Sequence, residues 1–231
     1  PLSVFDSILI PIHREGHRFV ALFALASALF FMLAEPLGWI GVVLTLGCAY
    51  FFRDPARVSP QREGLIISPA DGLVLSIERA LPPQGLGMGD DPRLRICIFM
   101  SVLDVHVNRA PATGTVTALT YHSGAFFNAS LDKASEQNER QAVRMTTSGG
   151  KDIAFVQIAG LIARRIVCHL AEGQTVKAGE RFGIIRFGSR LDVYLDEGMN
   201  PLVLAGQRAV AGETVLADQR SKEAPRKGEV Q

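Results

Sequence analysis

The sequence predicts a mainly β protein, an antiparallel β-sandwich or barrel-like domain preceded by an N-terminal α-helical membrane hairpin. Two long apolar stretches near the start predict the helices, and short apolar runs separated by Gly, Pro and Asp predict the strands. Two similar glycine-containing turns near the end are typical of β-hairpins. The chain has 231 residues, 48% of them hydrophobic, which suffices for one substantial core or two small ones.

The helical hairpin is predicted from residues 19–52, where Glu35 is the only formally charged residue. Glu35 begins a Glu-Pro-Leu-Gly turn between two apolar arms, residues 19–34 and 37–52. At a rise of about 1.5 Å per residue, each arm spans roughly 24 Å, less than the roughly 30 Å hydrocarbon core of a bilayer. We therefore expect two shallow or tilted helices rather than one long span.

Basic residues flank this hairpin on both sides. Arg14 and Arg18 precede the first arm, Arg53 and Arg57 follow the second, and the central turn has none. This asymmetry predicts that both ends lie on the cytoplasmic face of the cell membrane. Two other interpretations stay open: a secretory signal peptide, against which the second arm argues, and a helical hairpin buried in a soluble core.

The chain divides into an expected hairpin (residues 1–57), a β-rich catalytic domain (58–217) and a charged, frayed tail (218–231). Residues 82–89, rich in Pro and Gly, predict a flexible loop, and the polar residues 131–141 predict a short helix or an ordered loop. The expected strands are residues 64–68, 72–77, 94–101, 114–121, 142–146, 153–158, 166–169, 183–187 and 190–195.

A weak internal repeat supports the predicted architecture. Residues 173–180, Gly-Gln-Thr-Val-Lys-Ala-Gly-Glu, resemble residues 206–213, Gly-Gln-Arg-Ala-Val-Ala-Gly-Glu. Both resemble the glycine turns of biotinyl/lipoyl-type β-sandwiches. The alternative is two ordinary hairpins that share turn chemistry.

Charge and cysteine content narrow the possible partners. The chain holds 24 basic and 23 acidic residues. This near balance gives no net positive electrostatic field that would attract nucleic acid. Cys48, Cys97 and Cys168 are scattered, without a Cys-x-x-Cys pair, so neither a disulfide framework nor a zinc site is indicated. We expect no nucleic-acid partner and no metal.

The dipeptide Gly188-Ser189 lies in an apolar run and is a candidate site of self-cleavage. A serine hydroxyl can attack the carbonyl of a preceding glycine and convert the amide into an ester, because the glycine leaves that carbonyl open. The alternative is an ordinary Gly-Ser turn, in which the serine satisfies local backbone hydrogen bonds.

Two other segments supply polar groups. In Ser-Pro-Ala-Asp-Gly, Asp71 stands at the entrance of a strand, where it is either the acid of an Asx turn or a functional carboxylate. Asp104, His106 and Asn108 have even spacing, so they project from one face if that segment is extended. His106 is either a hydrogen-bonded core residue or a functional imidazole.

The sequence resembles a short-form phosphatidylserine decarboxylase in an ordered set of features that covers nearly the whole chain. These are the membrane hairpin, Ser-Pro-Ala-Asp-Gly, Asp-Val-His-Val-Asn-Arg-Ala-Pro, Phe-Asn-Ala-Ser-Leu-Asp-Lys-Ala and Gly-Ser-Arg. The resemblance implies that Ser189 attacks the Gly188 carbonyl, and that β-elimination and hydrolysis then leave a pyruvoyl group at residue 189. It further implies a heterodimer of a β chain (residues 1–188) and an α chain (189–231).

The resemblance also implies the reaction, in which phosphatidylserine in the membrane loses carbon dioxide and becomes phosphatidylethanolamine. Decarboxylation leaves electrons on the α-carbon, and a ketone-type carbonyl can accept them through an imine with the substrate amine. The pyruvoyl group derived from Ser189 is then the cofactor, in place of pyridoxal phosphate or a metal. His106 is the expected proton donor to the α-carbon, because imidazole is matched to neutral pH. A higher oligomer is compatible with this scheme.

One residue departs from the family pattern. Long-form relatives carry His-x-x-His in the segment around His106, whereas here Arg109 occupies the second position. Asp71 is therefore expected only as one member of an activation site, and the base that activates Ser189 is unassigned. Arginine does not act as a base near neutral pH but binds phosphate, so Arg109 and Arg190 are candidate contacts to the lipid phosphate. The alternative for both is an ordinary surface charge.

Two rival functions remain at this stage. The first is a membrane-anchored, lipoyl-like adaptor or carrier without catalysis, which accounts for the hairpin and the glycine turns but not for the ordered polar motifs. The second is decarboxylation of another serine phospholipid, such as archaetidylserine.

Overall fold

The computed structural model forms two compact units. One contains Pro1–Ala56 together with Leu103–Val105, and the other contains Arg57–Val102 and His106–Gln231. The structure describes residues 10–126, 137–160, 165–186, 189–224 and 226–229.

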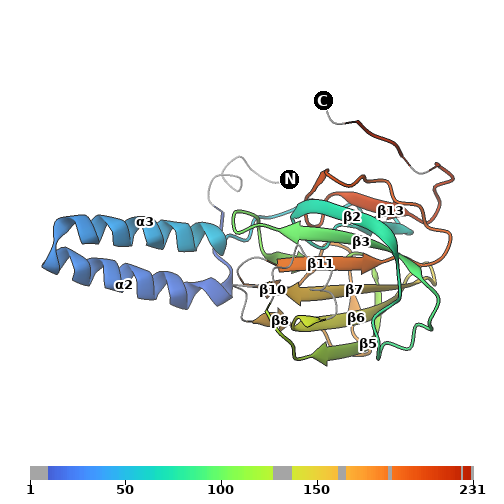
Figure 1. Cartoon of the computed structure of the whole chain (residues 1–231), viewed down its shortest axis with the longest axis horizontal. Helices are drawn as coiled ribbons and strands as arrows, with labels where there is room; N and C mark the ends of the chain where they lie inside the picture. Colours follow the sequence, from blue (N-terminus) through green and yellow to red (C-terminus); the bar gives the residue numbers. More distant parts are fainter. Residues whose placement is uncertain (1–9, 127–136, 161–164, 187–188, 225, 230–231) are drawn as a thin grey trace. The chain divides into compact units, whose positions relative to one another are not determined.

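The N-terminal unit holds a short 3-10 turn, η1 (Arg14–Gly16), and two helices, α2 (His17–Leu33) and α3 (Glu35–Phe51) (Figure 1). The helices are separated by Ala34, whose extended backbone (φ −162°, ψ 132°) interrupts the helical path. Pro36 lies in the first turn of α3, where its missing N–H has no intrahelical acceptor to lose. The break falls at the predicted turn, so the expected pair of helices is confirmed.

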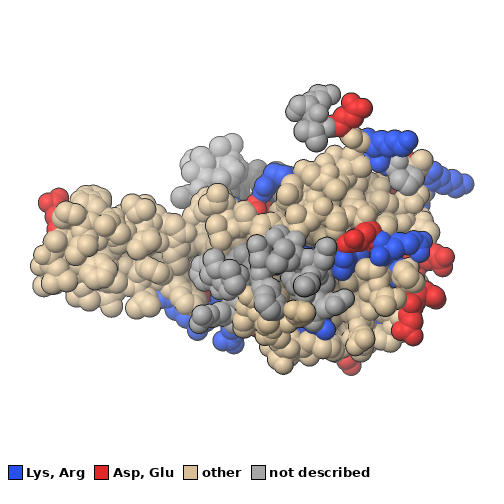
Figure 2. Space-filling model, in the orientation of Figure 1, with Lys and Arg blue, Asp and Glu red and all other residues tan. Residues whose placement is uncertain are grey.

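Small residues let α2 and α3 pack closely. The Ser27 hydroxyl donates to the Gly38 carbonyl at 2.9 Å, and a Cβ at Gly41 would lie 2.7 Å from the Cβ of Ser27. The surface of the helices is apolar and nearly free of charge (Figure 2). The stretch Arg14–Leu33 is long and apolar enough to cross a membrane by length and composition. Close approach of small residues beneath an apolar exterior is typical of membrane helix pairs.

The second unit consists of antiparallel sheets. Its largest sheet has the order β12-β2-β3-β11-β7-β6-β5-β9, a second sheet has the order β4-β10-β8, and β1 pairs with β13 (Figure 1). The strands are β1 (Leu65–Ile67), β2 (Gly72–Ala80), β3 (Arg93–Met100), β4 (Val107–Arg109), β5 (Gly114–His122), β6 (Arg140–Thr147), β7 (Asp152–Ala159), β8 (Ile166–Cys168), β9 (Thr175–Val176), β10 (Arg181–Ile185), β11 (Ser189–Tyr194), β12 (Arg208–Ala209) and β13 (Val215–Asp218). The predicted class, mainly antiparallel β with an N-terminal helical pair, is confirmed.

All nine predicted strands have counterparts, but the short strands β4, β9, β12 and β13 were not predicted. Strands of two residues, such as β9 and β12, are too short to show a period of two. The even spacing of Asp104, His106 and Asn108 puts them on one face only in an extended segment, and this condition is not met. Residues 102–104 form a turn and bend, and the strand begins only at Val107.

The predicted loop at residues 82–89 contains no helix or strand, but it is anchored at two points. Leu86 and Met88 are buried against the outer face of the large sheet. The residues beneath them are Ala142, Ala154, Val156, Ile158 and Tyr194. Two apolar side chains therefore tie a Pro- and Gly-rich loop to the sheet, which its composition did not indicate.

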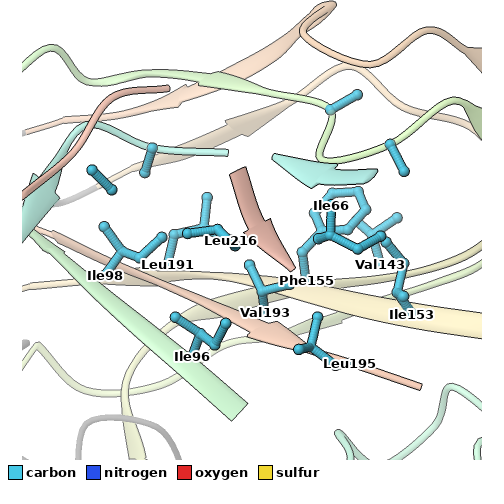
Figure 3. Close-up of a cluster of buried hydrophobic side chains, with 14 of the residues drawn as sticks. Ile66, Ile96, Ile98, Val143, Ile153, Phe155, Leu191, Val193, Leu195 and Leu216 are labelled. Atoms are coloured by element: carbon cyan, nitrogen blue, oxygen red, sulfur yellow. The ribbon is translucent and has the colours of Figure 1, made fainter. Parts of the chain in front are cut away.

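The main core lies on the inner face of the large sheet. Strand β11 alternates strictly: Leu191 and Val193 join this core, whereas Tyr194 belongs to the outer cluster. Ser189 has the phase of Leu191 and Val193 and therefore faces inward. Figure 3 shows part of the core with Ile66, Ile96, Ile98, Val143, Ile153, Phe155, Leu191, Val193, Leu195 and Leu216 labelled.

The two halves of the large sheet are built alike. The Gly206 N–H donates to the Val74 carbonyl in one half, and the Gly173 N–H donates to the Val116 carbonyl in the other, both at 2.8 Å. Irregular register follows directly after Val74 in β2 and directly after Val116 in β5. The two similar glycine turns of the sequence therefore occupy equivalent places, which favours a duplicated unit over coincidence.

The equivalence extends to the turns that precede β2 and β5. Pro-Ala-Asp-Gly ends at Gly72, and Pro-Ala-Thr-Gly ends at Gly114. In the first turn, Asp71 Oδ1 accepts a hydrogen bond from the Ala211 N–H at 2.7 Å. In the second, Thr113 Oγ1 accepts one from the Ala178 N–H at 3.0 Å. One oxygen of Asp71 thus has a structural task that a threonine hydroxyl performs in the other half.

Candidate active site

Ser189 begins β11 at the centre of the large sheet, where it pairs with Met100 of β3 and Ala159 of β7. Its side chain is fully buried, and Oγ donates to Met100 Sδ at 3.8 Å. A thioether is a weak acceptor, so this contact restrains the hydroxyl less than an oxygen acceptor would. Gly188, the other half of the predicted cleavage site, lies outside the described residues, as does the Phe-Asn-Ala-Ser-Leu-Asp-Lys-Ala motif.

One member of a buried pair of amide side chains reaches the same methionine sulfur. Asn108 Nδ2 donates to Met100 Sδ at 3.7 Å, and Gln157 Nε2 donates to Asn108 Oδ1 at 2.8 Å. Both amides are fully buried. Asn108 comes from β4 of the smaller sheet, where it stands opposite Gly183. Packing of the two sheets therefore brings Asn108 and Ser189 to one sulfur atom.

The amide pair is not fully satisfied. Within the described part of the chain, Gln157 Oε1 is buried and has no hydrogen-bond partner. A buried polar atom without a partner is costly, and such atoms concentrate where the structure serves catalysis or binding. Gln157 was not identified from the sequence as part of the candidate site. The available signal was a single polar residue within the otherwise apolar Ile153–Ala159 stretch.

His106 is fully buried and directly precedes β4. Its carbonyl accepts a hydrogen bond from the Ile185 N–H at 3.4 Å, at the end of β10. Ile185 is four residues before Ser189 in the sequence. The β4–β10 pairing thus brings the backbone of His106 beside the segment that leads to the predicted cleavage site.

Asp71 lies in the turn before β2, and its carboxylate joins two parts of the chain. Oδ1 accepts from the Ala211 N–H, and Oδ2 pairs with the Arg57 guanidinium at 2.8 Å. Strand β3 lies between β2 and β11, which separates the backbones near Asp71 and Ser189 by roughly 10 Å. These contacts put Asp71 two strands away from Ser189.

Arg109 is almost fully buried, with 5% of its surface exposed. Its Nη1 donates to the Gly179 carbonyl at 2.9 Å, and a Cβ at Gly212 would lie 2.9 Å from its Cδ. Gly179 and Gly212 belong to the two equivalent glycine turns, both with positive φ. Arg109 thus packs against both turns, which favours a structural role over the expected contact with a lipid phosphate.

Arg190 lies on the outer face of β11, opposite to Ser189, and is 1% exposed. Its Nε donates to Asp192 Oδ1 at 2.5 Å, and its Nη2 donates to Cys97 Sγ at 2.9 Å. Burial disfavours the charged guanidinium, but the Asp192 carboxylate outweighs burial and holds the pKa of Arg190 above its ordinary value. Burial and Asp192 also raise the pKa of Cys97 to about 12. The buried Arg190–Asp192 pair, like the contacts of Arg109, indicates a structural role. We therefore assign neither arginine to the substrate site.

Among the residues that the structure describes, no group of three His, Cys, Asp or Glu side chains is placed to hold a metal ion. Cys48, Cys97 and Cys168 are free thiols. Asn108 and Gln157 supply the amide groups linked to Ser189 through Met100, and the His106 carbonyl accepts from Ile185, four residues before Ser189.

Comparison with known proteins gives this arrangement a family. A sequence profile described as phosphatidylserine decarboxylase matches residues 44–217, which includes every strand but the last residue of β13. The chain belongs to the phosphatidylserine decarboxylase family. The resemblance read from the ordered motifs is thus confirmed, and the family is one of decarboxylases.

Three relatives match this chain over nearly its full length. Each is named phosphatidylserine decarboxylase proenzyme. The protein of Cereibacter sphaeroides is 60% identical, covering 98% of this chain and 98% of the relative. That of Paramagnetospirillum magneticum is 57% identical (99% and 95%), and that of Ruegeria pomeroyi is 58% identical (94% and 99%).

Proposed function

We propose that this chain decarboxylates phosphatidylserine to phosphatidylethanolamine and carbon dioxide, after cutting its own backbone between Gly188 and Ser189. One observation carries the proposal: a fully buried serine hydroxyl lies against a thioether beside a buried amide pair, in a family whose relatives are named proenzymes. A serine in a purely structural role at such a place would be expected to have an oxygen acceptor.

The cofactor follows from the same residue. A pyruvoyl group formed from Ser189 supplies a carbonyl that accepts the electrons released when carbon dioxide leaves. The surroundings fit such a group, because Asn108 donates only to a weak acceptor and Gln157 Oε1 has no partner among the described residues. Because β11 is hydrogen-bonded between β3 and β7, the α chain (189–231) stays attached to the β chain (1–188) after cleavage.

The chain's own residues have distinct roles in this scheme. His106, buried beside the segment that leads to Ser189, delivers the proton to the substrate α-carbon. Asp71 belongs to the activation step, in which the chain is cut, and acts there from the turn before β2. Self-cleavage and decarboxylation therefore depend on different side chains, apart from Ser189.

The membrane is the source of the substrate. The apolar helices α2 and α3 anchor the chain, and the basic residues Arg14, Arg18, Arg53 and Arg57 at their ends support a location on the cytoplasmic face of the cell membrane. An anchored enzyme meets its lipid in the bilayer and does not have to extract it into water.

Intact-mass measurement on the purified protein, combined with a carbon dioxide assay on phosphatidylserine vesicles, tests the function. We expect two fragments, of which the smaller begins at residue 189 with a blocked terminus. Ser189→Ala should remain one chain and release no carbon dioxide. His106→Ala should still be cut, because its role comes later, but should lose turnover by at least about a hundredfold.

Each of these measurements has an outcome that contradicts the proposal. A single uncut and inactive parent chain supports the adaptor or carrier function instead. Carbon dioxide release by Ser189→Ala rules out the cofactor. Turnover near the parent rate by His106→Ala rules out that proton donor.

A further inference from the structure

The amide pair Asn108–Gln157 is linked to Ser189 through Met100 Sδ, and neither amide is yet assigned a step in self-cleavage. Its two members come from different sheets and are 49 residues apart in the sequence. Both side chains are fully buried, so neither makes hydrogen bonds to bulk solvent. A buried polar pair next to a reacting hydroxyl can stabilise charge there, because electrostatic interactions are stronger away from water.

The donor of this pair has a poor acceptor in the uncut chain. Asn108 Nδ2 and Ser189 Oγ both donate to Met100 Sδ, at 3.7 and 3.8 Å. A thioether accepts hydrogen bonds weakly, whereas an oxygen that gains negative charge accepts them strongly. The N–H of Asn108 is therefore available to an oxygen at residue 189 at little cost.

Gln157 fixes the direction of that donor. Its Nε2 donates to Asn108 Oδ1 at 2.8 Å, which turns the Nδ2 end of Asn108 toward Met100 Sδ, the atom that also accepts from Ser189 Oγ. Gln157 Nε2 also lies 3.4 Å from the Val167 carbonyl, an acceptor that selects this orientation of the amide. Gln157 thus acts through Asn108 and is a positioning residue.

We propose that Asn108 is a catalytic hydrogen-bond donor to Ser189 Oγ during self-cleavage, held in place by Gln157; this rests on the proposed function. Oγ carries negative charge twice. It does so first when its proton passes to a base, before the bond to the Gly188 carbonyl carbon moves that charge onto the carbonyl oxygen. Collapse of this intermediate breaks the Gly188–Ser189 C–N bond, and the nitrogen takes up the proton that Oγ lost. It does so again in the elimination, when a base takes the Cα proton, the electrons of that C–H bond form the Cα=Cβ double bond, and the Cβ–Oγ bond breaks with its electron pair left on Oγ in the Gly188 carboxylate.

The rate of self-cleavage in freshly folded full-length chain, followed by intact mass, tests the role of Asn108. Asn108→Leu removes the donor while keeping similar volume, and removal of one such donor typically slows a reaction about 10²- to 10³-fold. We expect slowing by at least tenfold in protein that retains the parent's circular dichroism. Asn108→Asp, which has the same shape, is judged by the same threshold if Asn108→Leu does not fold.

Gln157→Glu tests the positioning role through pH. A glutamate carboxylate has no proton for Asn108 Oδ1, but a protonated glutamic acid has one. Self-cleavage of Gln157→Glu should therefore be slow at pH 8 and recover relative to the parent as the pH falls toward 5. A merely structural role predicts the same ratio to the parent at every pH at which both proteins stay folded.

The control is Asn138→Asp, a matched change at another buried asparagine whose Nδ2 donates to the Ala159 carbonyl at 2.7 Å. The rate of self-cleavage of Asn138→Asp should stay within threefold of the parent rate. If the parent is cut and Asn108→Leu is cut within threefold of it, the role of Asn108 is overturned while the proposed function stands. If the parent itself is not cut, the proposed function fails first. A pH-independent ratio for Gln157→Glu overturns the role of Gln157.

Discussion

At the scale of single residues, the structural task of Asp71 can be separated from its proposed role in self-cleavage. One oxygen accepts the Ala211 N–H, as Thr113 accepts the Ala178 N–H in the other half of the sheet. The second oxygen pairs with Arg57, an interaction that a threonine cannot make. The internal repeat therefore supplies a substitution that separates the two tasks.

Asp71→Thr should keep the turn and lose the carboxylate. We expect the free energy of unfolding to fall by about 1 kcal/mol or less, because the ion pair with Arg57 is partly exposed to solvent. If Asp71 belongs to the activation site, self-cleavage slows at least about tenfold in the same folded protein. Denaturant unfolding and intact mass measure the two effects, with Thr113→Asp as the reciprocal variant. Cleavage of Asp71→Thr at the parent rate leaves Asp71 with the structural task alone.

At the scale of elements, the β6–β7 pair contains an ion pair that links stability to pH. Asp152 pairs with the Arg144 guanidinium and accepts a hydrogen bond from Thr146 Oγ1 at 2.6 Å. Burial by itself raises the pKa of Asp152, but Thr146 and Arg144 outweigh it and hold that pKa below its ordinary value of 3.8. A carboxyl group whose pKa is lower in the folded state stabilises the fold above its unfolded pKa. That stabilisation disappears as the pH falls through the folded pKa.

Asp152→Asn, made in the uncut Ser189→Ala chain, should therefore destabilise the fold in a pH-dependent way. We expect a loss of about 1 kcal/mol at pH 7, since both side chains are partly exposed, and a smaller loss below pH 3.8. Urea unfolding at pH 7, 5 and 3 measures the difference, with Asp91→Asn, at an exposed position just before β3, as the control. A difference that stays constant from pH 7 to pH 3 contradicts the assigned ion pair.

At the scale of the whole molecule, membrane binding and self-cleavage are assigned to different units of the chain. The exposed side chains of α2 and α3 are apolar, and Leu29 and Val43 are 54% and 67% exposed. The described groups around Ser189 all belong to the second unit, which contains the antiparallel sheets. A change on the outside of the helices should thus affect lipid binding without affecting the cut.

Leu29→Asp combined with Val43→Asp should abolish flotation of the full chain with phosphatidylserine-containing vesicles. Each aspartate near the centre of a membrane helix costs about 3 kcal/mol, so vesicle binding should weaken by more than about a hundredfold. Self-cleavage should keep the parent rate. Val58→Asp, at an exposed apolar residue outside the helices, should float like the parent. Unchanged flotation of the double variant contradicts a membrane role for the helices.

The amino-acid sequence determined those features whose signals are local. Charge distribution and a Glu-Pro turn predicted the helical pair, and runs of apolar residues between Gly and Pro predicted the longer strands, because both patterns reflect backbone geometry over a few residues. The order of short motifs predicted the family, and the Gly188-Ser189 dipeptide predicted a place of cleavage. None of these inferences needed to know which strands are neighbours.

Only the tertiary structure decided what surrounds Ser189. The register of β3, β11 and β7 puts Ser189 on the inner face with Met100 and puts Arg190 on the outer face with Asp192. Packing of the smaller sheet adds Asn108, and the pairing of distant strands leaves Asp71 two strands away. Such contacts depend on register between segments tens of residues apart, and shifting a strand by one residue reverses every side chain on it. No local pattern encodes that choice, because it is made by packing of the whole core.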